Sequence, residues 1–288
     1  MLNTTLIVTR VPAQSGDARQ IFAPAGVQVL DFPLQHIGPP PDLPRFHAAL
    51  AALPQTDLAV PVSPTAVAAV FAALPGPWPA RCAIGVVGEG SLRAVRCALA
   101  AQPDDLPWPR LIAPDTREEP PGEGDSDALW SALQLAFAPG PVASFPWAGR
   151  SVRIFRGGPG RDLLARRLEE AGAKVKIIEA YSRLAPEFNA QTVAQLHAAL
   201  GSGGWWLFSS SEAVRNLQGL LAQAAIAPAL LEQQRALAIH PRIAQTLREA
   251  GFGLVELTSA PPEAVLSTLR RLSTPRSLSD LSFADSRG

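Results

Sequence analysis

Short apolar runs alternate along the chain with longer stretches whose apolar residues recur at helical spacing. The helical stretches include Asp162–Ala171 and Glu212–Ala222. Alternation of this kind predicts parallel sheets covered by helices on both faces, which is an α/β fold. The runs with the length and apolar character of strands are Leu6–Thr9, Val27–Phe32, Leu58–Val62, Ala83–Val87, Leu111–Ala113, Val152–Arg156, Val175–Glu179, Trp206–Ser209, Ala236–Ile239 and Leu254–Leu257.

Proline and glycine mark breaks between these elements. Gly38–Pro44 is rich in proline and Arg117–Asp125 is acidic with Pro and Gly, so we expect both to be loops. Pro61 stands inside an apolar run, which indicates an edge strand or a local irregularity. From Thr274 onward the chain is polar and rich in serine, and residues 274–288 are expected to form a disordered tail.

The chain contains an internal repeat. Each copy begins with a strand that ends in an arginine, Arg10 in the first copy and Arg156 in the second. Each copy then continues through a loop and a helix to an Ala-Gly pair and enters a second strand. The spacing from Arg10 to Gly26 equals the spacing from Arg156 to Gly172, so the copies align without a gap.

Three further pairs of segments match in the same order, each near the start of a helix. Four ordered matches indicate two similar lobes. The three pairs are Ser63-Pro64-Thr65-Ala66-Val67 with Ser210-Ser211-Glu212-Ala213-Val214, Val87-Gly88-Glu89-Gly90 with Ile239-His240-Pro241-Arg242, and Asp127-Ala128-Leu129 with Glu263-Ala264-Val265.

The repeated arginines, hydroxyl residues and glycines stand where strands end and helices begin. In parallel α/β sheets, ligands bind outside the carboxyl ends of the strands. Helix N-termini there offer unpaired N–H groups and a partial positive charge. Each serine on its own is explained as a helix cap, because Ser and Thr are common N-cap residues. Two such turns and two strand-end arginines together predict a site for an anionic ligand, in a cleft between the lobes.

Composition restricts the class of protein. The 288 residues are 47% hydrophobic and 17% charged, which suits two packed domains. A net charge of zero gives no basic field for nucleic acid or a membrane surface. No apolar run is long enough to span a bilayer, and the N-terminus lacks the features of a signal peptide. We expect a cytoplasmic protein with no nucleic-acid or membrane partner.

Several kinds of site find no support in the sequence. Cys82 and Cys97 have no disulfide or metal-binding spacing, so both are expected to be buried apolar residues in a reducing compartment. None of the four histidines has metal-ligand spacing. The chain has no dinucleotide fingerprint, phosphate loop or nucleophile elbow. These observations argue against metal, nucleotide and hydrolase chemistry.

Tyr181 is the only tyrosine in the chain. It follows the second strand of the second copy, and Gln35 occupies the matching place in the first copy. A lone tyrosine is most often a packing residue whose hydroxyl contacts water. Its position alone therefore assigns Tyr181 no function.

The ordered motifs resemble those of the uroporphyrinogen-III synthase family. The resemblance runs from Leu6 to Leu272, nearly the whole chain, and depends on the set rather than on one strong motif. The matching features are the strand end Thr9-Arg10, the strand that ends in Pro33-Leu34, the Ser-x-x-Ala-Val turns at Ser63 and Ser210, the pair Tyr181 and Arg183, and the turn His240-Pro241-Arg242-Ile243-Ala244, which is similar to the third turn of some bacterial members.

This resemblance implies an enzyme that converts hydroxymethylbilane, a linear tetrapyrrole, into uroporphyrinogen III without a metal or organic cofactor. Water is lost, the ring closes and ring D is inverted. Tyr181 would donate a hydrogen bond to the departing hydroxyl. The residues that the resemblance places against the polycarboxylate substrate are Thr9, Arg10, Ser63, Thr65, Gly88, Glu89, Gly90, Ser91, Arg156, Gly157, Arg183, Ser209, Ser210, Ser211, His240, Pro241 and Arg242.

One turn departs from the family pattern. Many members have Gly-x-Thr where this chain has His240-Pro241-Arg242. A bulky cationic turn thus replaces a small hydroxyl-bearing one. A threonine contact is lost there, and Arg242 is expected to meet a substrate carboxylate instead.

The resemblance also implies two similar flavodoxin-like, doubly wound lobes joined by a two-segment hinge. Residues 1–35 and 184–273 would form lobe 1 and residues 36–183 lobe 2, with Tyr181 at the hinge. We expect a monomer that makes transient contact with the preceding enzyme of the pathway. The alternative is a two-lobed, hinge-closing binding protein for a small anionic ligand, which would need no tyrosine. A nucleotide-sugar transferase would need a nucleotide site, which the sequence does not contain.

Overall fold

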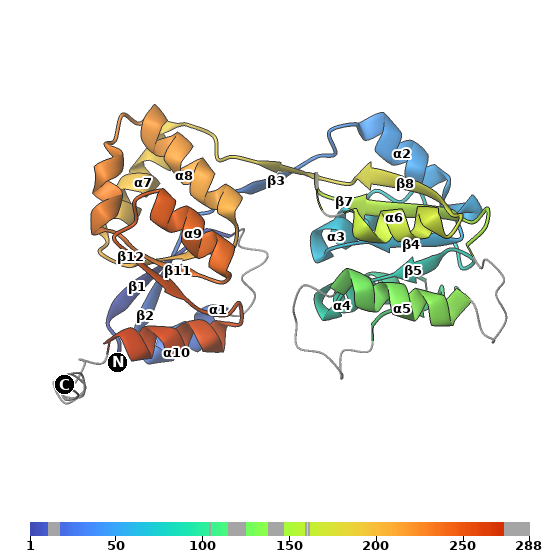
Figure 1. The fold of residues 1–288 in the computed structure, drawn as a ribbon, viewed down its shortest axis with the longest axis horizontal. Coiled ribbons are helices and arrows are strands. Elements are labelled where there is room, and N and C mark those ends of the chain that lie inside the picture. Colours follow the sequence, from blue (N-terminus) through green and yellow to red (C-terminus); the bar gives the residue numbers. More distant parts are fainter. Residues whose placement is uncertain are drawn as a thin grey trace, which may run out of the picture. The chain divides into compact units, whose positions relative to one another are not determined.

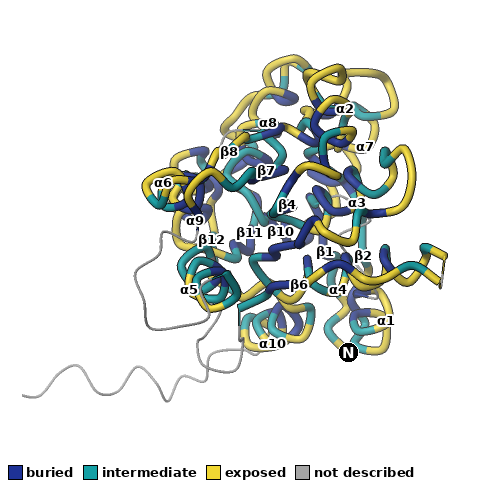
Figure 2. Tube along the Cα trace, turned by 90° about the vertical axis from the view of Figure 1, so that its right-hand side faces the viewer, coloured by how far each residue is buried: buried dark blue, intermediate teal, exposed yellow. Residues whose placement is uncertain are grey.

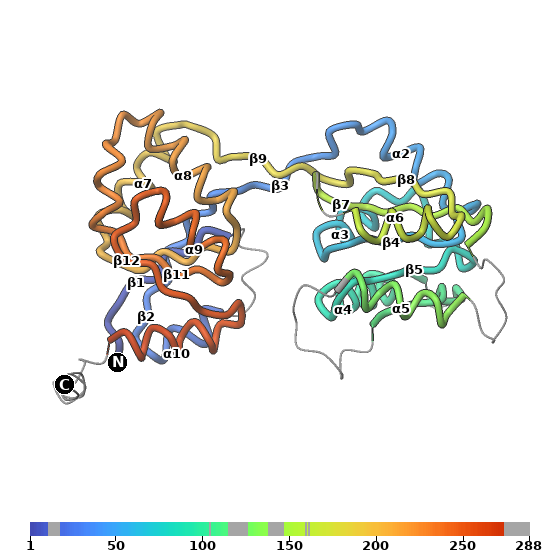
Figure 3. The backbone as a smooth tube through the Cα atoms, viewed as in Figure 1, coloured from blue at the N-terminus to red at the C-terminus, as the bar shows by residue number. Residues whose placement is uncertain are grey.

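The computed structural model describes residues 1–10, 18–103, 105–114, 125–137, 147–158, 160 and 162–273. The chain divides into two compact units. Unit 1 comprises Met1–His36 and the chain from Leu184 onward, and unit 2 comprises Ile37–Arg183. Unit 1 therefore contains both the blue and the red segments in Figure 3. The predicted tail, 274–288, and most of the predicted loop 117–125 lie outside the described residues.

Unit 1 is built on a parallel five-stranded sheet with the order β2-β1-β10-β11-β12 (Figure 1). Its strands are β1 (Thr4–Val8), β2 (Val27–Asp31), β10 (Trp205–Phe208), β11 (Arg235–Ala238) and β12 (Leu254–Leu257). Its helices are α1 (Ala18–Phe22), α7 (Ala190–Gly201), α8 (Ser211–Gln223), α9 (Pro241–Glu249) and α10 (Pro262–Ser273), with short 3₁₀ turns η2 (Ala23–Ala25) and η4 (Pro228–Gln233).

Alternate residues of these strands enter two separate cores, because successive side chains of a strand point to opposite faces. Ile7 and Trp206 pack with α7, α8 and α9 on one face. Leu6, Val8 and Leu207 pack with α1 and α10 on the other. Both faces are apolar, so the strands read as continuous hydrophobic runs, as expected for a parallel sheet covered on both sides.

Unit 2 repeats this plan with the sheet order β6-β5-β4-β7-β8, again wholly parallel. Its strands are β4 (Leu58–Pro61), β5 (Ala83–Gly85), β6 (Leu111–Ile112), β7 (Ser151–Arg156) and β8 (Lys174–Glu179). Its helices are α2 (Leu43–Ala51), α3 (Pro64–Ala72), α4 (Glu89–Ala100), α5 (Asp125–Phe137) and α6 (Leu163–Glu170), with the 3₁₀ turn η3 (Leu53–Gln55).

The two units share one topology. One core of unit 2 holds α2, α3 and α4, and the other holds α5 and α6. If the strands of unit 2 are numbered from β7, in the sequence β7, β8, β4, β5, β6, their order across the sheet is 2-1-3-4-5. The strands of unit 1 have the same order, which is that of flavodoxin-like sheets. In Figure 2 the central strands are largely dark blue, and the helices are yellow on their outer sides. The predicted fold class, two similar doubly wound α/β lobes, is confirmed.

Two short strands mark the places where the chain passes from one unit to the other. They are β3 (His36–Gly38) and β9 (Ser182–Leu184), and they pair with each other. The sequence predicted neither strand, because three residues are too few to show an alternating pattern.

The structure corrects two local expectations about proline: the edge-strand alternative for Pro61 was wrong, and the loop predicted at Gly38–Pro44 is shorter than expected. Pro61 does not mark an edge strand: β4 is the central strand of its sheet, and Pro61 is its last residue. On the side of β7, the Val62 N–H donates to Phe155, so the nitrogen of Pro61 faces β5. Pairing with β5 ends at Ala59, and no sheet hydrogen bond therefore needs an N–H from Pro61. The predicted loop Gly38–Pro44 ends early, because α2 begins at Leu43 and Pro44 falls in its first turn, where proline is tolerated.

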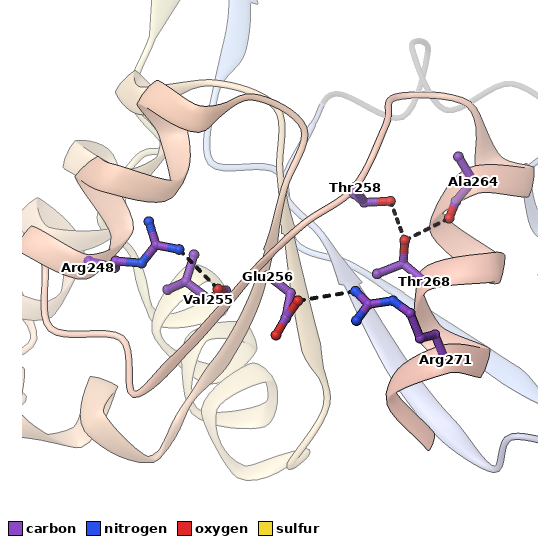
Figure 4. A network of polar contacts seen from close by, with 7 residues as sticks. All are labelled: Arg248, Val255, Glu256, Thr258, Ala264, Thr268 and Arg271. Atoms are coloured by element: carbon purple, nitrogen blue, oxygen red, sulfur yellow. Dashed lines mark hydrogen bonds and ion pairs between the residues drawn. The ribbon is translucent and has the colours of Figure 1, made fainter. Parts of the chain in front are cut away.

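The edge strand β12 is joined to α10 and α9 by polar contacts (Figure 4). Arg271 donates to Glu256 at 3.2 Å, and the hydroxyls of Thr258 and Thr268 are 2.9 Å apart. Arg248 donates to the Val255 carbonyl at 3.4 Å. The contact to Val255 occupies a backbone carbonyl of the edge strand that could otherwise pair with another chain.

The cysteines differ from each other. Cys82 is buried as expected, but the expectation that Cys97 is buried was wrong, since it lies on the exposed side of α4. Burial raises the pKa of the Cys82 thiol to about 12. The thiolate is the reactive form of cysteine, so a buried thiol with a high pKa reacts slowly.

We therefore expect one thiol per chain to react with a thiol reagent in the folded protein near neutral pH. The second thiol should react only after unfolding in denaturant. Cys97→Ser should abolish the fast reaction and Cys82→Ser should leave it intact. Equal reaction rates for both thiols in the folded protein would contradict this assignment.

Candidate functional site

In unit 2, polar residues gather where the strand order reverses. β4 and β7 are neighbours, but the helices that follow them, α3 and α6, cover opposite faces of the sheet. In doubly wound sheets this switch point is where ligands bind. Ser63 lies there as the N-cap of α3, and its Oγ accepts a hydrogen bond from the Ala66 N–H at 3.1 Å.

The Tyr181 hydroxyl lies against this serine. The side-chain oxygens of Tyr181 and Ser63 are 3.3 Å apart, and Nη2 of Arg183 donates to the Tyr181 oxygen at 3.4 Å. The Arg183 guanidinium also lies 5.9 Å from the centre of the tyrosine ring, within cation–π range. Ser63 therefore caps a helix and also helps to hold the phenol, while Arg183 places a positive charge beside it.

Tyr181 is buried, with 3% of its surface exposed, and its ring belongs to the core beneath α2, α3 and α4. Gly157, directly after β7, makes room for this ring. A Cβ on residue 157 would lie 2.2 Å from Cε2 and Cζ of Tyr181, far inside contact distance. The structure thus brings Gly157 to the tyrosine, where the glycine supports the ring.

Three chain segments meet at the equivalent switch point of unit 1, between β1 and β10. Thr9 is buried, and its Oγ1 donates to the Leu207 carbonyl at 2.7 Å. The Thr9 carbonyl accepts from the Leu34 N–H at 2.9 Å, which joins the segment after β2 to this place. Ser210 is the N-cap of α8, and its Oγ accepts from the Ala213 N–H at 3.1 Å.

Gln35 occupies in unit 1 the place that Tyr181 occupies in unit 2. The spacing from Arg10 to Gln35 equals the spacing from Arg156 to Tyr181. As Tyr181 contacts the N-cap serine of α3, so Gln35 accepts from the Ser210 Oγ of α8 at 3.1 Å.

The other end of the Gln35 amide contacts a carboxylate. Its Nε2 donates to Oε2 of Glu212, in the first turn of α8, at 2.8 Å. Neither Gln35 nor Glu212 was among the predicted site residues. The available signal was the internal repeat, which aligned Gln35 with Tyr181.

The two strand-end arginines differ in their partners. Nη1 of Arg156 forms an ion pair with Oδ1 of Asp162 at 2.6 Å. Arg10 has no carboxylate partner among the described residues. The Nε of both arginines is buried without a hydrogen-bond partner there, so the two differ in the carboxylate alone. Burial lowers the pKa of Arg10, although an arginine remains charged at neutral pH. A partly desolvated cation that has no counter-ion among the described residues favours an anionic ligand.

The third turn of unit 2 has the small form that the sequence predicted. Gly88 is the N-cap of α4 without a side-chain bond, and its extended backbone precedes Glu89 and Gly90, which are both exposed. Ser91 is 3% exposed, so it lies behind the turn. The turn offers open backbone N–H groups at the start of a helix.

The third turn of unit 1 is capped by a histidine. Nδ1 of His240 accepts from the Arg242 N–H at 3.1 Å. Pro241 and Arg242 are exposed. Arg242 thus carries a positive charge at the positive end of a helix dipole, an unfavourable placement that a bound anion would relieve.

The remaining predicted residues lie where α3 and α8 begin. Thr65 is half-buried in the first turn of α3, and Ser209 is half-buried after β10. Ser211 accepts from the Thr246 hydroxyl at 3.1 Å, a contact that joins α8 to α9. The structure therefore gathers the predicted residues into one set in each unit. That one substrate contacts both sets stays a prediction.

A cavity of about 800 Å³ lies along β6 and α5, away from these turns. It contains none of the predicted site residues, and it lies at an edge of the sheet rather than at the switch point. Within the described part of the chain, no three His, Cys, Asp or Glu residues gather as a metal site would require. Nor does any helix there have the length and apolar composition needed to cross a bilayer.

Fold and site together define a class of protein: a doubly wound α/β protein in two units, with polar turns suited to an anionic ligand at the switch point of each sheet. Residues 17–264 match the family described as uroporphyrinogen-III synthase HemD. The chain belongs to the uroporphyrinogen-III synthase family, as the sequence motifs predicted.

The chain is also similar to individual proteins. The uroporphyrinogen-III synthase of Synechococcus elongatus is 29% identical over 234 residues, which cover 77% of this chain and 76% of the relative. The solved uroporphyrinogen-III synthetase of Helicobacter pylori 26695 is 13% identical and shares the fold, with a TM-score of 0.54 over 93% of this chain and 99% of that chain. A uroporphyrinogen III synthase structure from Thermus thermophilus is 20% identical, with a TM-score of 0.49 over 93% and 98% of the two chains.

Family membership disfavours the binding-protein alternative. A receptor that only closes around a ligand would share the lobes but not the synthase family's ordered motifs. The described residues also leave the nucleotide-sugar transferase without support, since neither switch point carries a nucleotide motif.

Proposed function

We propose that the chain dehydrates and cyclises hydroxymethylbilane, with inversion of ring D, to give uroporphyrinogen III. It would be a cyclising hydro-lyase that uses no cofactor. One observation carries the proposal: Ser63 and Arg183 hold the Tyr181 hydroxyl at the switch point of unit 2. The chain that contains this arrangement belongs to the synthase family.

The substrate chemistry suits the donors at the two switch points. Hydroxymethylbilane carries eight carboxylates, and charge-assisted hydrogen bonds are the strong class of contact for such groups. Arg10, Arg183 and Arg242 supply charged donors. The turn Gly88–Gly90 would add backbone N–H groups at a helix start. The Thr9 hydroxyl already donates to the Leu207 carbonyl, so Thr9 would hold its turn in place rather than touch the substrate, while Ser91 stays a predicted contact.

The reaction demands positioning more than strong acid or base. The hydroxyl departs readily and leaves an electrophilic azafulvene, and unaided closure gives the uninverted isomer. The enzyme must hold the chain so that ring D attacks through its substituted carbon. The resulting spiro intermediate then fragments and recloses inverted. Oriented binding can lower such a barrier by several kcal/mol.

Tyr181 would assist the first step as a hydrogen-bond donor. A phenol stays protonated at neutral pH and can donate to the oxygen that leaves as water. Ser63 and Arg183 would orient the hydroxyl, since both contact its oxygen. Arg183 also favours an oxygen that gains negative charge as it gives up its proton.

One assay tests the proposed function. Hydroxymethylbilane is generated in situ, the protein is added, and the oxidised products are separated into isomers I and III. We expect type III to dominate with the protein and type I without it. A product mixture equal to the protein-free control would exclude the synthase activity. A cytoplasmic location, a monomeric state and transient contact with the preceding enzyme stay predictions of the sequence.

Gly157→Ala is expected to disturb the tyrosine through crowding alone. The added Cβ would lie 2.2 Å from the Tyr181 ring, so the ring must shift within a packed core. We expect a loss of stability of about 1–3 kcal/mol and a loss of type III product comparable to that of Tyr181→Phe. Thermal melting and the isomer assay measure the two effects.

Gly76→Ala is the matched control in the same unit, because a Cβ there meets nothing within 4 Å. It should alter neither quantity. If Gly157→Ala kept full activity, as Gly76→Ala should, the activity would not depend on the present position of Tyr181. The proposed role of Tyr181 would then be wrong.

A further inference from the structure

The Gln35 amide in unit 1 has a forced orientation. A carboxylate can only accept, so Nε2 of Gln35 must face Oε2 of Glu212, to which it donates at 2.8 Å. Oε1 of Gln35 then faces Ser210, whose hydroxyl donates to it at 3.1 Å while its Oγ accepts from the Ala213 N–H. The segment itself is fixed as well, because Asn216 of α8 donates to the Leu34 carbonyl at 2.8 Å. Gln35 and α8 therefore hold the Glu212 carboxylate in one position.

Glu212 is an acidic residue beside the arginine and hydroxyl residues of this switch point, and its carboxylate can only accept hydrogen bonds. Among the described residues no arginine or lysine forms an ion pair with it, and only Gln35 donates to its side chain. The carboxylate is half-buried. A negative charge in the first turn of a helix is favourable by itself. That effect does not explain why a glutamine from a distant segment fixes one oxygen and leaves the other available.

The position of this carboxylate points to a donor on the ligand. Gln35 aligns with Tyr181 in the repeat, and both contact the N-cap serine of the helix that follows the central strand. The equivalent place thus holds a phenol in unit 2 and, in unit 1, the amide of Gln35, which holds the Glu212 carboxylate. The carboxylates of a linear tetrapyrrole cannot donate at neutral pH, but its pyrrole N–H groups can.

On this basis we propose that Glu212 accepts hydrogen bonds from pyrrole N–H groups of the substrate and that Gln35 is its positioning residue. The inference depends on the proposed synthase function and names a further specificity residue for it. Glu212 also repels substrate carboxylates. It therefore makes a ring present its N–H edge, rather than its acidic side chains, to this point of the site. Such orientation matters for a reaction whose unaided course gives the other isomer.

Glu212→Gln tests the carboxylate with little change of shape. We expect the KM for hydroxymethylbilane to rise about tenfold and the fraction of type III product to fall, since an amide is a weaker acceptor than a carboxylate. Glu212→Ala should raise KM further. Gln35→Met keeps the carboxylate but removes the group that fixes it, and should give an intermediate rise in KM.

Glu263→Gln is the matched control. Glu263 is also the second residue of a helix, α10, and is exposed outside both sets of site residues. Both Glu→Gln variants lose a charge near a helix start, so their melting temperatures should fall alike, while only Glu212→Gln alters KM and the isomer ratio. Equal KM values in Glu212→Gln, Gln35→Met and wild type, with wild type producing type III, would overturn the inference alone. A wild type without type III product would overturn the synthase function itself.

Discussion

Replacing Tyr181 with phenylalanine is expected to lower the rate of type III formation by about 10²-fold, near the lower end of what a positioned acid supplies. The lower end applies because the substrate hydroxyl departs readily without help. Phenylalanine keeps the ring in the core beneath α2, α3 and α4. It removes only the oxygen that contacts Ser63 and Arg183. Single-turnover formation of type III, with type I as the unassisted product, measures the effect.

The stability of this variant should change little by comparison. The lost contacts are two hydrogen bonds at 3.3 and 3.4 Å, and a typical bond contributes about 1 kcal/mol. Thr268→Val is a suitable control, because it removes hydroxyl contacts to Ala264 and Thr258 outside the site (Figure 4). It should lower the melting temperature similarly and leave turnover intact. Near-normal turnover in Tyr181→Phe would remove the acid role.

The sequence was sufficient for the architecture because both sheets are buried on both faces. Strands of this kind are continuous apolar runs. For the ten strands of the two five-stranded sheets, the predicted first and last residues differ from the observed ones by about two residues at most. The repeat supplied the correspondence between β1 and β7, which the sheet orders confirm. The short strands β3 and β9 escaped because their pairing, rather than their composition, defines them.

The site was predicted less completely, for a physical reason. Turn sequences identify helix caps, and Ser63, Ser210 and His240 are caps as their positions indicate. They do not identify partners that are distant along the chain. The contact of Gln35 with Glu212 joins two strand ends and depends on the folded sheet.

Burial was equally hard to read from a single sequence. Thr9 and Ser91 have side chains that suit a ligand, yet the fold covers both. Arg10 and Arg156 have identical places in the repeat, and only the folded chain shows that Asp162 pairs with one of them. That difference decides which arginine has charge to offer a ligand.

Arg10→Met is therefore expected to weaken substrate binding without weakening the fold. Arg10 is a partly buried cation with no counter-ion among the described residues, and burial lowers its pKa. Its desolvation is a cost to the folded protein at every pH at which arginine is charged. Removing the charge should leave the melting temperature unchanged or raise it. Methionine keeps an unbranched stem to pack in its place.

The KM for hydroxymethylbilane should rise about 10- to 100-fold in this variant, because a hydrogen-bonded charge pair with a carboxylate contributes roughly 1.5–3 kcal/mol. Arg156→Met should show the opposite balance: it breaks the 2.6 Å ion pair with Asp162, so stability should fall while KM changes less. Arg271→Met is the control, since exposed Arg271 pairs with Glu256 on the edge strand β12, outside both sets of site residues.

Substitution by lysine separates charge from geometry at the same position. A guanidinium can bind a carboxylate through two parallel hydrogen bonds, whereas an ammonium acts as a point charge. Arg10→Lys should therefore recover part of the binding that Arg10→Met loses. An Arg10→Met variant with wild-type KM and reduced stability would show that Arg10 serves the fold. In that case the carboxylates of the substrate would have to be bound by Arg183, Arg242 and the backbone of the third turns.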